Sequence, residues 1–175
     1  ASVGVSVTTL DGKLARAMEP RAATPARRLA AISGLAAAGV PVTVMAAPMI
    51  PAPNDSELEA ILEAGEKAGA TAAAYILLRL PRELKDLFTE WLEAHYPDRW
   101  RRVLNQVRAC RDGALYASDF GSRMKGTGVF AELLAKRFDV ACKRLGLNAA
   151  RAAEGTFDTG LFQPHERAGD QLNLW

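Results

Sequence analysis

Side chains that could bind a small polar ligand lie close together near the start of the chain. Ser6 and Thr8 end an alternating segment, and Glu19, Arg27 and Arg28 follow. Serine and threonine hydroxyls donate and accept hydrogen bonds. A carboxylate accepts hydrogen bonds from an ammonium group, and a planar guanidinium pairs well with a carboxylate. These residues could therefore bind a small polar ligand, although Glu19 could equally pair with a neighbouring arginine.

A second group of candidate residues lies further along the chain. Arg79 stands at the end of the otherwise apolar segment 70–80. A charge is costly to bury in such a segment, so Arg79 is a candidate for binding a ligand. The glycine-rich loop from Gly113 to Gly128 mixes aromatic and cationic residues, which could stack on bases and neutralise phosphates. The alternative is a loop that only closes the fold. The residues of this loop that we single out are Tyr116, Phe120, Arg123 and Lys125.

The cysteines and histidines do not form a metal-binding pattern. Cys110 and Cys142 are far apart, and neither has a histidine at ligand spacing. Both lie in helical patterns, where a small buried side chain is the favoured interpretation. His95 and His165 are equally isolated. We therefore expect neither a metal site in this chain nor a disulfide.

The composition is that of a globular protein. Of 175 residues, 49% are apolar and 24% are charged. No apolar run reaches the length of about 18 residues that a membrane span needs, so we expect a cytoplasmic protein. The charge is uneven, because residues 82–151 carry fourteen Lys and Arg against nine Asp and Glu. Such a basic block is typical of a protein with a polyanion partner, and a solvated helix surface explains it nearly as well.

Alternating strands and helices are predicted for the first unit, residues 1–81. Val3, Val5 and Val7 share one face of the opening segment, as in a strand with one face covered. Thr24 and Pro25 begin a helix in the usual way. Parallel crossovers join the elements. The expected elements are a strand over Ser2–Thr8, a helix over Thr24–Ala38, a strand over Val40–Pro48, a helix over Glu57–Ala68 capped by Asp55 or Ser56, and a strand over Ala70–Leu80.

Helices are predicted for the second unit, residues 82–150, and an extended tail for residues 151–175. Amphipathic stripes run through residues 84–92 and 100–107, and a further helix is expected over Val129–Leu145. The first strand begins the chain and would leave an open parallel edge, which is a liability. We therefore expect another segment, another chain or a swapped copy to cover that edge, or the sequence to be a fragment of a longer protein.

Several segments, taken in order, resemble radical S-adenosylmethionine enzymes related to spore photoproduct lyase, a group that includes DNA-repair lyases. The resemblance covers residues 1 to about 146 and places the chain at the fourth barrel strand and beyond. The segments that carry it are Ser6–Leu10, Glu19–Thr24, Arg27–Ala31, Ala38–Pro41, Val44–Pro51, Leu77–Pro81, Phe88–Leu92 and His95–Arg99.

The resemblance implies an α/β fold, namely half of a partial (β/α)6 barrel followed by a helical C-terminal region. In that family a CxxxCxxC loop after the first strand binds a 4Fe-4S cluster, and the cluster cleaves S-adenosylmethionine reductively to start radical chemistry. This chain lacks that loop, so by itself it is expected to be inactive. The parent enzyme is expected to act as a lyase on a nucleic-acid-related substrate, and we assign no catalytic residue.

The resemblance also suggests which residues meet the ligands. One parity of each strand should face the barrel lumen, which would bring Thr43, Tyr75 and Leu77 there with the proposed cofactor-binding residues. Arg27 or Arg28 would pair with the ligand carboxylate, and Arg28 is preferred. The expected S-adenosylmethionine-binding residues are Ser6, Thr8, Glu19, Arg28, Met45, Ala47 and Arg79, and the expected nucleic-acid-binding residues are Tyr116, Arg123 and Lys125.

The last five residues resemble the short motif with which bacterial repair and replication proteins bind the DNA sliding clamp. Two alternate leucines and a terminal aromatic residue after a polar linker could enter an apolar pocket. The alternative is a tail that packs back on its own domain. The residues concerned are Gln171, Leu172, Leu174 and Trp175. The competing function for the whole chain is accordingly a non-catalytic module that binds nucleic acid or the clamp.

Overall fold

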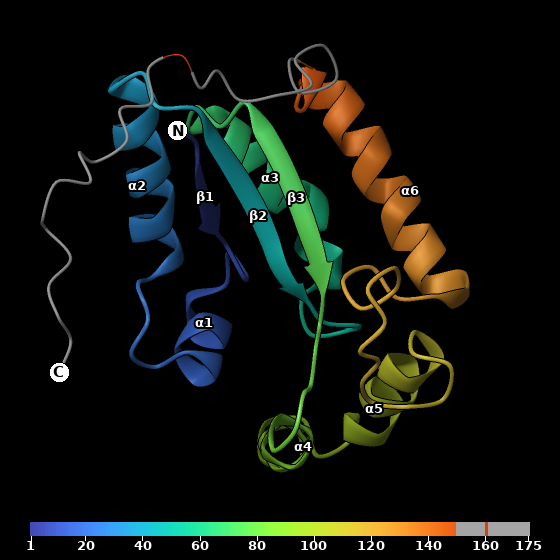
Figure 1. The fold of residues 1–175 in the computed structure, drawn as a ribbon. Coiled ribbons are helices and arrows are strands. Elements are labelled where there is room, and N and C mark those ends of the chain that lie inside the picture. The colour runs from blue at the N-terminus through green and yellow to red at the C-terminus, as the bar shows by residue number, and fades with distance from the viewer. Residues whose placement is uncertain (150–159, 161–175) are drawn as a thin grey trace, which may run out of the picture.

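The computed structural model describes residues 1–149 and Gly160, and it shows a mixed α/β fold (Figure 1). Its centre is a parallel sheet of three strands in the order β1-β2-β3. The strands are β1 (Val3–Ser6), β2 (Val42–Met49) and β3 (Ala72–Leu77). Three parallel strands with helices between them confirm the α/β prediction for this part of the chain.

Helices connect the strands and follow the last one. Between β1 and β2 lie α1 (Gly12–Met18) and α2 (Pro25–Ala37), and between β2 and β3 lie the 3-10 turn η1 (Asp55–Glu57) and α3 (Leu58–Lys67). The elements after β3 are α4 (Leu84–His95), α5 (Trp100–Ala109) and α6 (Gly128–Leu145). Only α1 was not expected, because it is short and buries a single residue, Leu14, so that its sequence shows no apolar stripe.

The two predicted helix starts have different outcomes. Thr24 caps α2 as expected, since its hydroxyl accepts a hydrogen bond from the backbone N–H of Arg27 at 3.4 Å. The predicted cap of the next helix is wrong, because Asp55 and Ser56 belong to η1 and α3 has no side-chain cap. The Asp55 carboxylate instead accepts from the N–H of Ala52 at 2.6 Å, in the turn before the helix.

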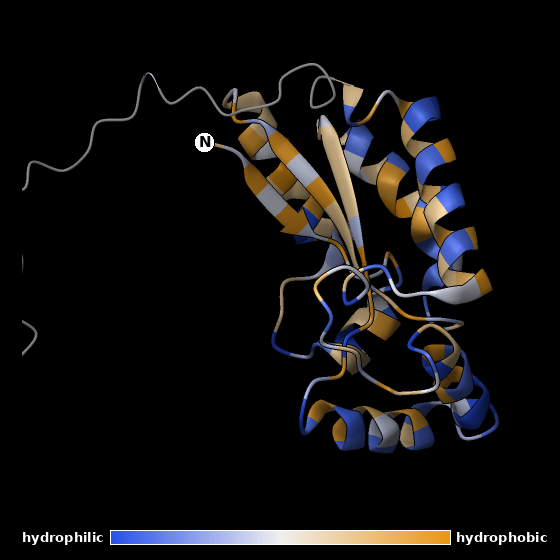
Figure 2. Ribbon diagram, turned by 45° about the vertical axis from the view of Figure 1, so that its right-hand side comes forward, coloured by the Kyte–Doolittle hydropathy of each residue, from blue (hydrophilic) through white to orange (hydrophobic). Residues whose placement is uncertain are grey.

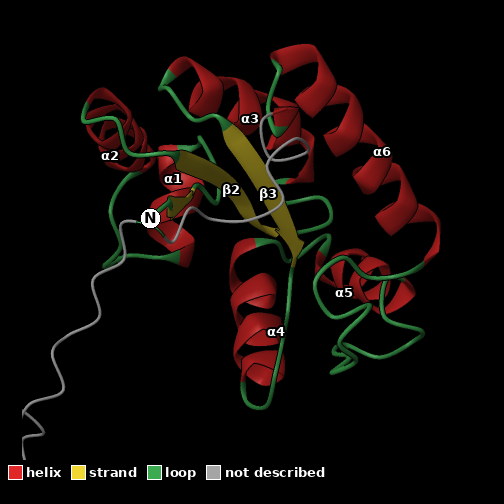
Figure 3. Ribbon diagram, turned by 45° about the horizontal axis from the view of Figure 1, so that its top comes forward, coloured by secondary structure: helices red, strands yellow, loops and turns green. Residues whose placement is uncertain are grey.

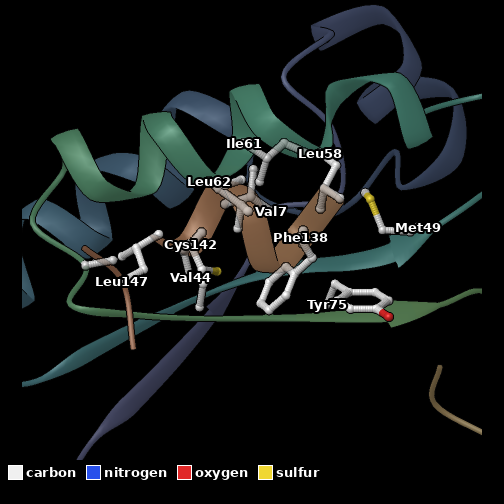
Figure 4. Packing of buried hydrophobic residues seen from close by; sticks show 14 of the residues in the cluster. Val7, Val44, Met49, Leu58, Ile61, Leu62, Tyr75, Phe138, Cys142 and Leu147 are labelled. Atoms are coloured by element: carbon white, nitrogen blue, oxygen red, sulfur yellow. The ribbon is translucent and has the colours of Figure 1, made fainter. Parts of the chain in front are cut away.

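One face of the sheet forms the main core with α2, α3 and α6. Side chains from these helices and from β2 and β3 interlock, as Figure 4 shows for Val44, Ile61 and Phe138. The rings of Tyr75 and Phe138 are 4.9 Å apart. The helix α3 comes so close to β2 that a β-carbon at Gly65 would lie 2.6 Å from the β-carbon of Val44. The glycine is therefore required by packing.

A second apolar cluster lies beyond the carboxyl ends of β2 and β3, where α4 and α5 pack (Figures 1 and 3). Figure 2 shows that the strands are largely hydrophobic, whereas the outer helices carry both hydrophobic and hydrophilic residues. The amphipathic stripe predicted for α5 is confirmed by its buried residues. The stripe predicted for α4 is confirmed only in part, because Leu92 is buried whereas Leu84 and Leu87 are exposed. The buried residues of this cluster are Ile50, Leu78, Leu80, Leu92, Val103, Leu104 and Val107.

The opposite face of the sheet carries small or partly exposed side chains, and no helix or strand of residues 1–149 covers it (Figure 1). The predicted orientation of the first strand is confirmed at its end, since Val7 is buried in the main core. The orientation predicted for Tyr75 and Leu77 is wrong, because both point into the same core. Their strand is apolar throughout, so it has no alternation from which its orientation could be predicted.

Candidate functional site

Thr8 lies at the carboxyl end of β1 and begins a polar network. Its side chain is 3% exposed, and its Oγ1 atom lies 3.2 Å from both Glu19 Oε2 and the carbonyl oxygen of Ala47. One hydroxyl proton can serve only one of these acceptors at a time. Thr8 therefore connects the end of β2 with the segment that follows α1.

Arg28 holds the Glu19 carboxylate in place. Its Nη2 atom lies 2.7 Å from Glu19 Oε2, and its Nη1 atom donates to the carbonyl of Ser6 at 2.9 Å. Its Nε atom donates to the carbonyl of Ala23 at 2.9 Å. The structure thus brings together four of the predicted residues, but Ser6 takes part through its backbone. Glu19 pairs with a nearby arginine, as one of the two interpretations had it.

The second oxygen of Glu19 has no hydrogen bond within residues 1–149. Glu19 lines a surface pocket of about 320 Å³ beside α1. Two cationic side chains, Lys13 and Arg16, line the same pocket. Two acidic residues, Asp11 and Glu19, and two basic ones therefore line one opening, a combination that suits a ligand carrying both an ammonium group and a carboxylate.

Asn54 ties the ends of β1 and β2 together, a role that sequence reasoning missed. It is fully buried. Its Nδ2 atom donates to the carbonyls of Thr8 at 2.6 Å and Pro48 at 2.9 Å, and its Oδ1 atom accepts from the N–H of Ile50 at 2.6 Å. The loop sequence explains an asparagine simply as a turn residue, so no local signal indicates this buried role.

Thr9 and Glu57 make a further connection at this end of the sheet. The Thr9 hydroxyl donates to Glu57 Oε1 at 2.7 Å, and the N–H of Leu10 donates to Glu57 Oε2 at 2.6 Å. The start of the segment leading to α1 is thereby fastened to η1. These contacts position Thr8, because they fix the backbone immediately after it.

Met45 of β2 lies just before an irregularity in the strand, and Ala47 lies within it. Met45 is on the open face, where its sulfur would lie 3.1 Å from a β-carbon at Gly4. The register with β3 shifts between Ala46 and Met49, and Ala47 is buried. Ala47 accordingly contributes its carbonyl to the Thr8 network, whereas Met45 is available to the open face.

Arg79 belongs to a different cluster, beyond the end of β3. Its Nη2 atom lies 3.4 Å from the Tyr116 hydroxyl, and its Nη1 atom lies 3.8 Å from the sulfur of Met124. The same loop is held to the strand because the N–H of Leu77 donates to the carbonyl of Met124 at 2.8 Å. The structure therefore joins Arg79 to the predicted nucleic-acid-binding loop and not to the Thr8 network.

Arg111 anchors this loop and was also missed by the sequence analysis. It is 3% exposed. Its Nη2 atom donates to the carbonyls of Leu77 at 3.3 Å and Leu78 at 2.9 Å, and its Nη1 atom donates to the carbonyl of Ser122 at 3.0 Å. The helical pattern around it gave no reason to expect a buried charge. Burial lowers the pKa of its guanidinium.

Arg123 and Lys125 point to different places. The Arg123 guanidinium lies 3.9 Å from the centre of the Phe120 ring, and that ring is 84% exposed. Lys125 Nζ lies 5.4 Å from the centre of the Tyr75 ring. Lys125 also lines a second pocket, of about 240 Å³, beside β3. Of the three predicted nucleic-acid-binding residues, Tyr116 contacts Arg79 directly. Arg123 precedes Met124, the other contact of Arg79. Lys125 instead lines the second pocket together with Tyr75 and Phe138.

The thiols present in the chain do not fit an iron–sulfur cluster. Cys110 ends α5 and Cys142 lies in α6, and both are buried. Burial raises the pKa of both thiols, with that of Cys142 reaching about 11. Cluster ligands are thiolates, and three or four of them must converge. Among the described side chains, no three His, Cys, Asp or Glu residues gather where they could hold a metal ion.

The sequence also led to predictions about a membrane span and about a clamp-binding motif at the C-terminus. Among the helices described, none combines the length and the apolar character needed to cross a membrane. The proposed clamp-binding residues fall outside the described residues, so that motif stays a prediction. They are Gln171, Leu172, Leu174 and Trp175.

Comparison with known proteins finds relatives that match part of the chain. No family model matches it, and no solved structure matches it. An uncharacterized protein of Mycobacterium bovis and uncharacterized proteins from two strains of Mycobacterium tuberculosis are each 36% identical to it over 99 residues. The match covers 55% of this chain and 29% of each relative. The chain is therefore similar to a segment of longer mycobacterial proteins.

Proposed function

We propose that the chain is the C-terminal half of the barrel of a radical S-adenosylmethionine enzyme and that its Thr8–Glu19 network binds the amino-acid end of that cofactor. The observation that carries this proposal is a parallel sheet that is covered on one face and open on the other, with a polar network at the carboxyl ends of its strands. Ligands collect at this end of parallel sheets and barrels.

In this proposal Glu19 accepts a hydrogen bond from the ammonium group of the ligand through the oxygen that Arg28 leaves free. Arg28 orients Glu19 and binds the backbone of β1, so its first role is positioning. Lys13 and Arg16, which line the same pocket as Glu19, supply positive charge for the ligand carboxylate. Met45 lies on the open face beside Gly4, outside the lining of this pocket.

S-adenosylmethionine, bound with a 4Fe-4S cluster, supplies radical chemistry, and the protein positions the reactants and excludes water. The residues of this chain do not fit the cluster, so its cysteines must come from an upstream segment or a separate chain. The mycobacterial relatives are longer than this chain, as a whole barrel requires. We place the parent enzyme in the cytoplasm and give it a nucleic-acid-related substrate, which the basic segment 82–151 supports.

Binding of S-adenosylmethionine to the 175-residue chain, measured by equilibrium dialysis, tests the site. Glu19→Gln should weaken binding about tenfold or more, because it removes a charge-assisted hydrogen bond. Glu63→Gln is the matched control, since Glu63 forms an exposed ion pair with Lys67 on α3, away from the network. Equal affinities of the two variants would contradict the proposed site.

The assignment to the enzyme class has its own test. The reading frame upstream of Ala1 should contain CxxxCxxC about 100 residues earlier, given roughly 30 residues for each strand–helix unit. Protein expressed with that segment should be brown and contain iron. An upstream frame without the motif, together with iron-free protein, would contradict the enzyme assignment.

The second candidate function is a non-catalytic module that binds nucleic acid or the sliding clamp. The exposed Phe120 ring beside Arg123 favours the nucleic-acid part of this function. A labelled peptide ending in the last residues, Leu172 to Trp175, tests the clamp part by fluorescence anisotropy. No binding at high micromolar clamp would exclude it.

A further inference from the structure

Three arginines at the end of β3 have no acidic partner. Within residues 1–149, Arg79, Arg111 and Arg123 form no ion pair with a carboxylate. Arg79 contacts a thioether and a phenol, Arg111 contacts carbonyls, and Arg123 lies against an aromatic ring. Arg111 is 3% exposed, and a charged group this far from water normally has a counter-charge, whereas Arg79 and Arg123 are half-buried.

Each of these arginines also holds an unused donor. The Nε atoms of Arg79, Arg111 and Arg123 are buried and have no hydrogen-bond acceptor. Buried donors without an acceptor are rare in native proteins and call for an explanation such as a missing ligand. The acids of the loop do not supply one, because Asp112 accepts from Thr127 and Asp119 is exposed.

The loop that carries these groups is built against the sheet. Gly126 adopts a φ of +74°, and a β-carbon there would lie 2.7 Å from the Leu77 side chain and 2.8 Å from the Cys110 carbonyl. Only glycine allows the loop to approach the strand this closely. Together with the hydrogen bonds of Arg111, this contact presents the cations at the carboxyl end of a parallel strand, where anionic ligands often bind.

We propose that Arg79, Arg123 and the Tyr116 hydroxyl, supported by Arg111, bind a phosphate group. Arginine is the side chain best suited to phosphate oxygens, since its planar fork can donate two parallel hydrogen bonds. The exposed Phe120 ring next to Arg123 offers a surface on which a base can stack. This inference deepens the proposed function by assigning the phosphate anchor of its substrate, and it does not depend on the Thr8–Glu19 network.

The test measures anion binding by the 175-residue chain without S-adenosylmethionine, so that it stands even if the cofactor site fails. The probes are a labelled ten-nucleotide oligothymidylate, followed by fluorescence anisotropy, and pyrophosphate as its competitor. Arg79→Gln and Arg123→Gln should each weaken binding about tenfold. The matched control, Arg102→Gln, removes the same charge from the exposed surface of α5 and should change affinity by about twofold or less.

Further arms distinguish the source of the phosphate. If the oligonucleotide binds more tightly than pyrophosphate and the Phe120→Leu variant binds it more weakly, the phosphate belongs to a nucleic acid. If pyrophosphate binds as tightly as the oligonucleotide and the Phe120→Leu variant keeps the same affinity, the phosphate belongs to a small phosphorylated ligand. Arg111 is not substituted, because its loss would release the loop. The inference is overturned if Arg79→Gln and Arg123→Gln bind like Arg102→Gln while all variants melt as the parent does, or if neither probe binds.

Discussion

Replacing Asn54 by aspartate should destabilise the protein strongly, although the side chain barely changes size. Asn54 donates from Nδ2 to the carbonyls of Thr8 and Pro48 at 2.6 and 2.9 Å. Aspartate places an oxygen at that position, which cannot donate when ionised. The change therefore removes both hydrogen bonds and sets a carboxylate against two carbonyl oxygens in a fully buried site.

The expected magnitude follows from the unmade hydrogen bonds. A buried polar group left without its partner costs about 1–3 kcal/mol, and two carbonyls are affected. We expect a loss of about 4 kcal/mol at pH 7. For a chain of this size each kcal/mol lowers the melting temperature by roughly 2–4 °C, so the fall should be roughly 8–16 °C.

The assay is thermal unfolding followed by circular dichroism, with Asn105→Asp as the matched control. Asn105 is exposed on α5, and its Oδ1 atom accepts from Arg108 Nη1 at 3.1 Å. Aspartate keeps that acceptor, so the control should change stability by less than about 0.5 kcal/mol. The chemical change is the same in both variants, and only the environment differs.

The pH dependence gives a second check on the Asn54→Asp variant. Burial beside carbonyl oxygens should raise the pKa of the new carboxyl group in the folded state. A raised folded pKa makes the defect largest above that pKa and smaller at acid pH, where the protonated acid can donate one hydrogen bond. Melting within about 2 °C of Asn105→Asp at pH 7 would refute the role assigned to Asn54.

Three further predictions concern the core, an ion pair and the thiols. Gly65→Ala should lower stability by about 2 kcal/mol through overpacking, whereas Gly34→Ala, which meets no atom, should raise it by about 1 kcal/mol; urea titrations that give both variants the same sign would contradict this. The hydrogen bond from Arg137 lowers the pKa of Glu59, so the stability that Glu59→Gln removes should be present above about pH 4.3 and vanish as pH falls through the lower folded pKa; a difference that persists at acid pH in the same titrations would count against the ion pair. Both cysteines are buried with raised pKa values, so a thiol reagent at pH 8 should label neither until guanidinium is added, and rapid native labelling would show that the helices pack differently.

Local sequence patterns were sufficient for most elements of the fold. Val3, Val5 and Val7 alternate with polar or small residues, which identifies a half-covered strand, and Thr24 with Pro25 marks a helix start. These signals work because strand and helix periods and helix caps depend on residues close in sequence. For the same reason the short α1 was missed, since one buried leucine makes no period.

The candidate site was predictable only in part. The nearness of Ser6, Thr8, Glu19 and Arg28 follows from a single strand and the loop and helix after it. The contacts of Arg79 could not be predicted from its own segment, because they come from a loop more than thirty residues away, and its role in binding a cofactor stays a prediction.

The sequence by itself determined an α/β fold, the order of its main elements and a polar cluster at the end of the first strand. Only the tertiary structure decided that Tyr75 faces the helices, that Asn54 joins two strand ends and that Arg111 is a buried charge. The physical reason is that burial and hydrogen-bond partners depend on which segments meet in space. A uniformly apolar strand, a turn asparagine and an arginine that follows a helix look the same in sequence whether they are buried or exposed.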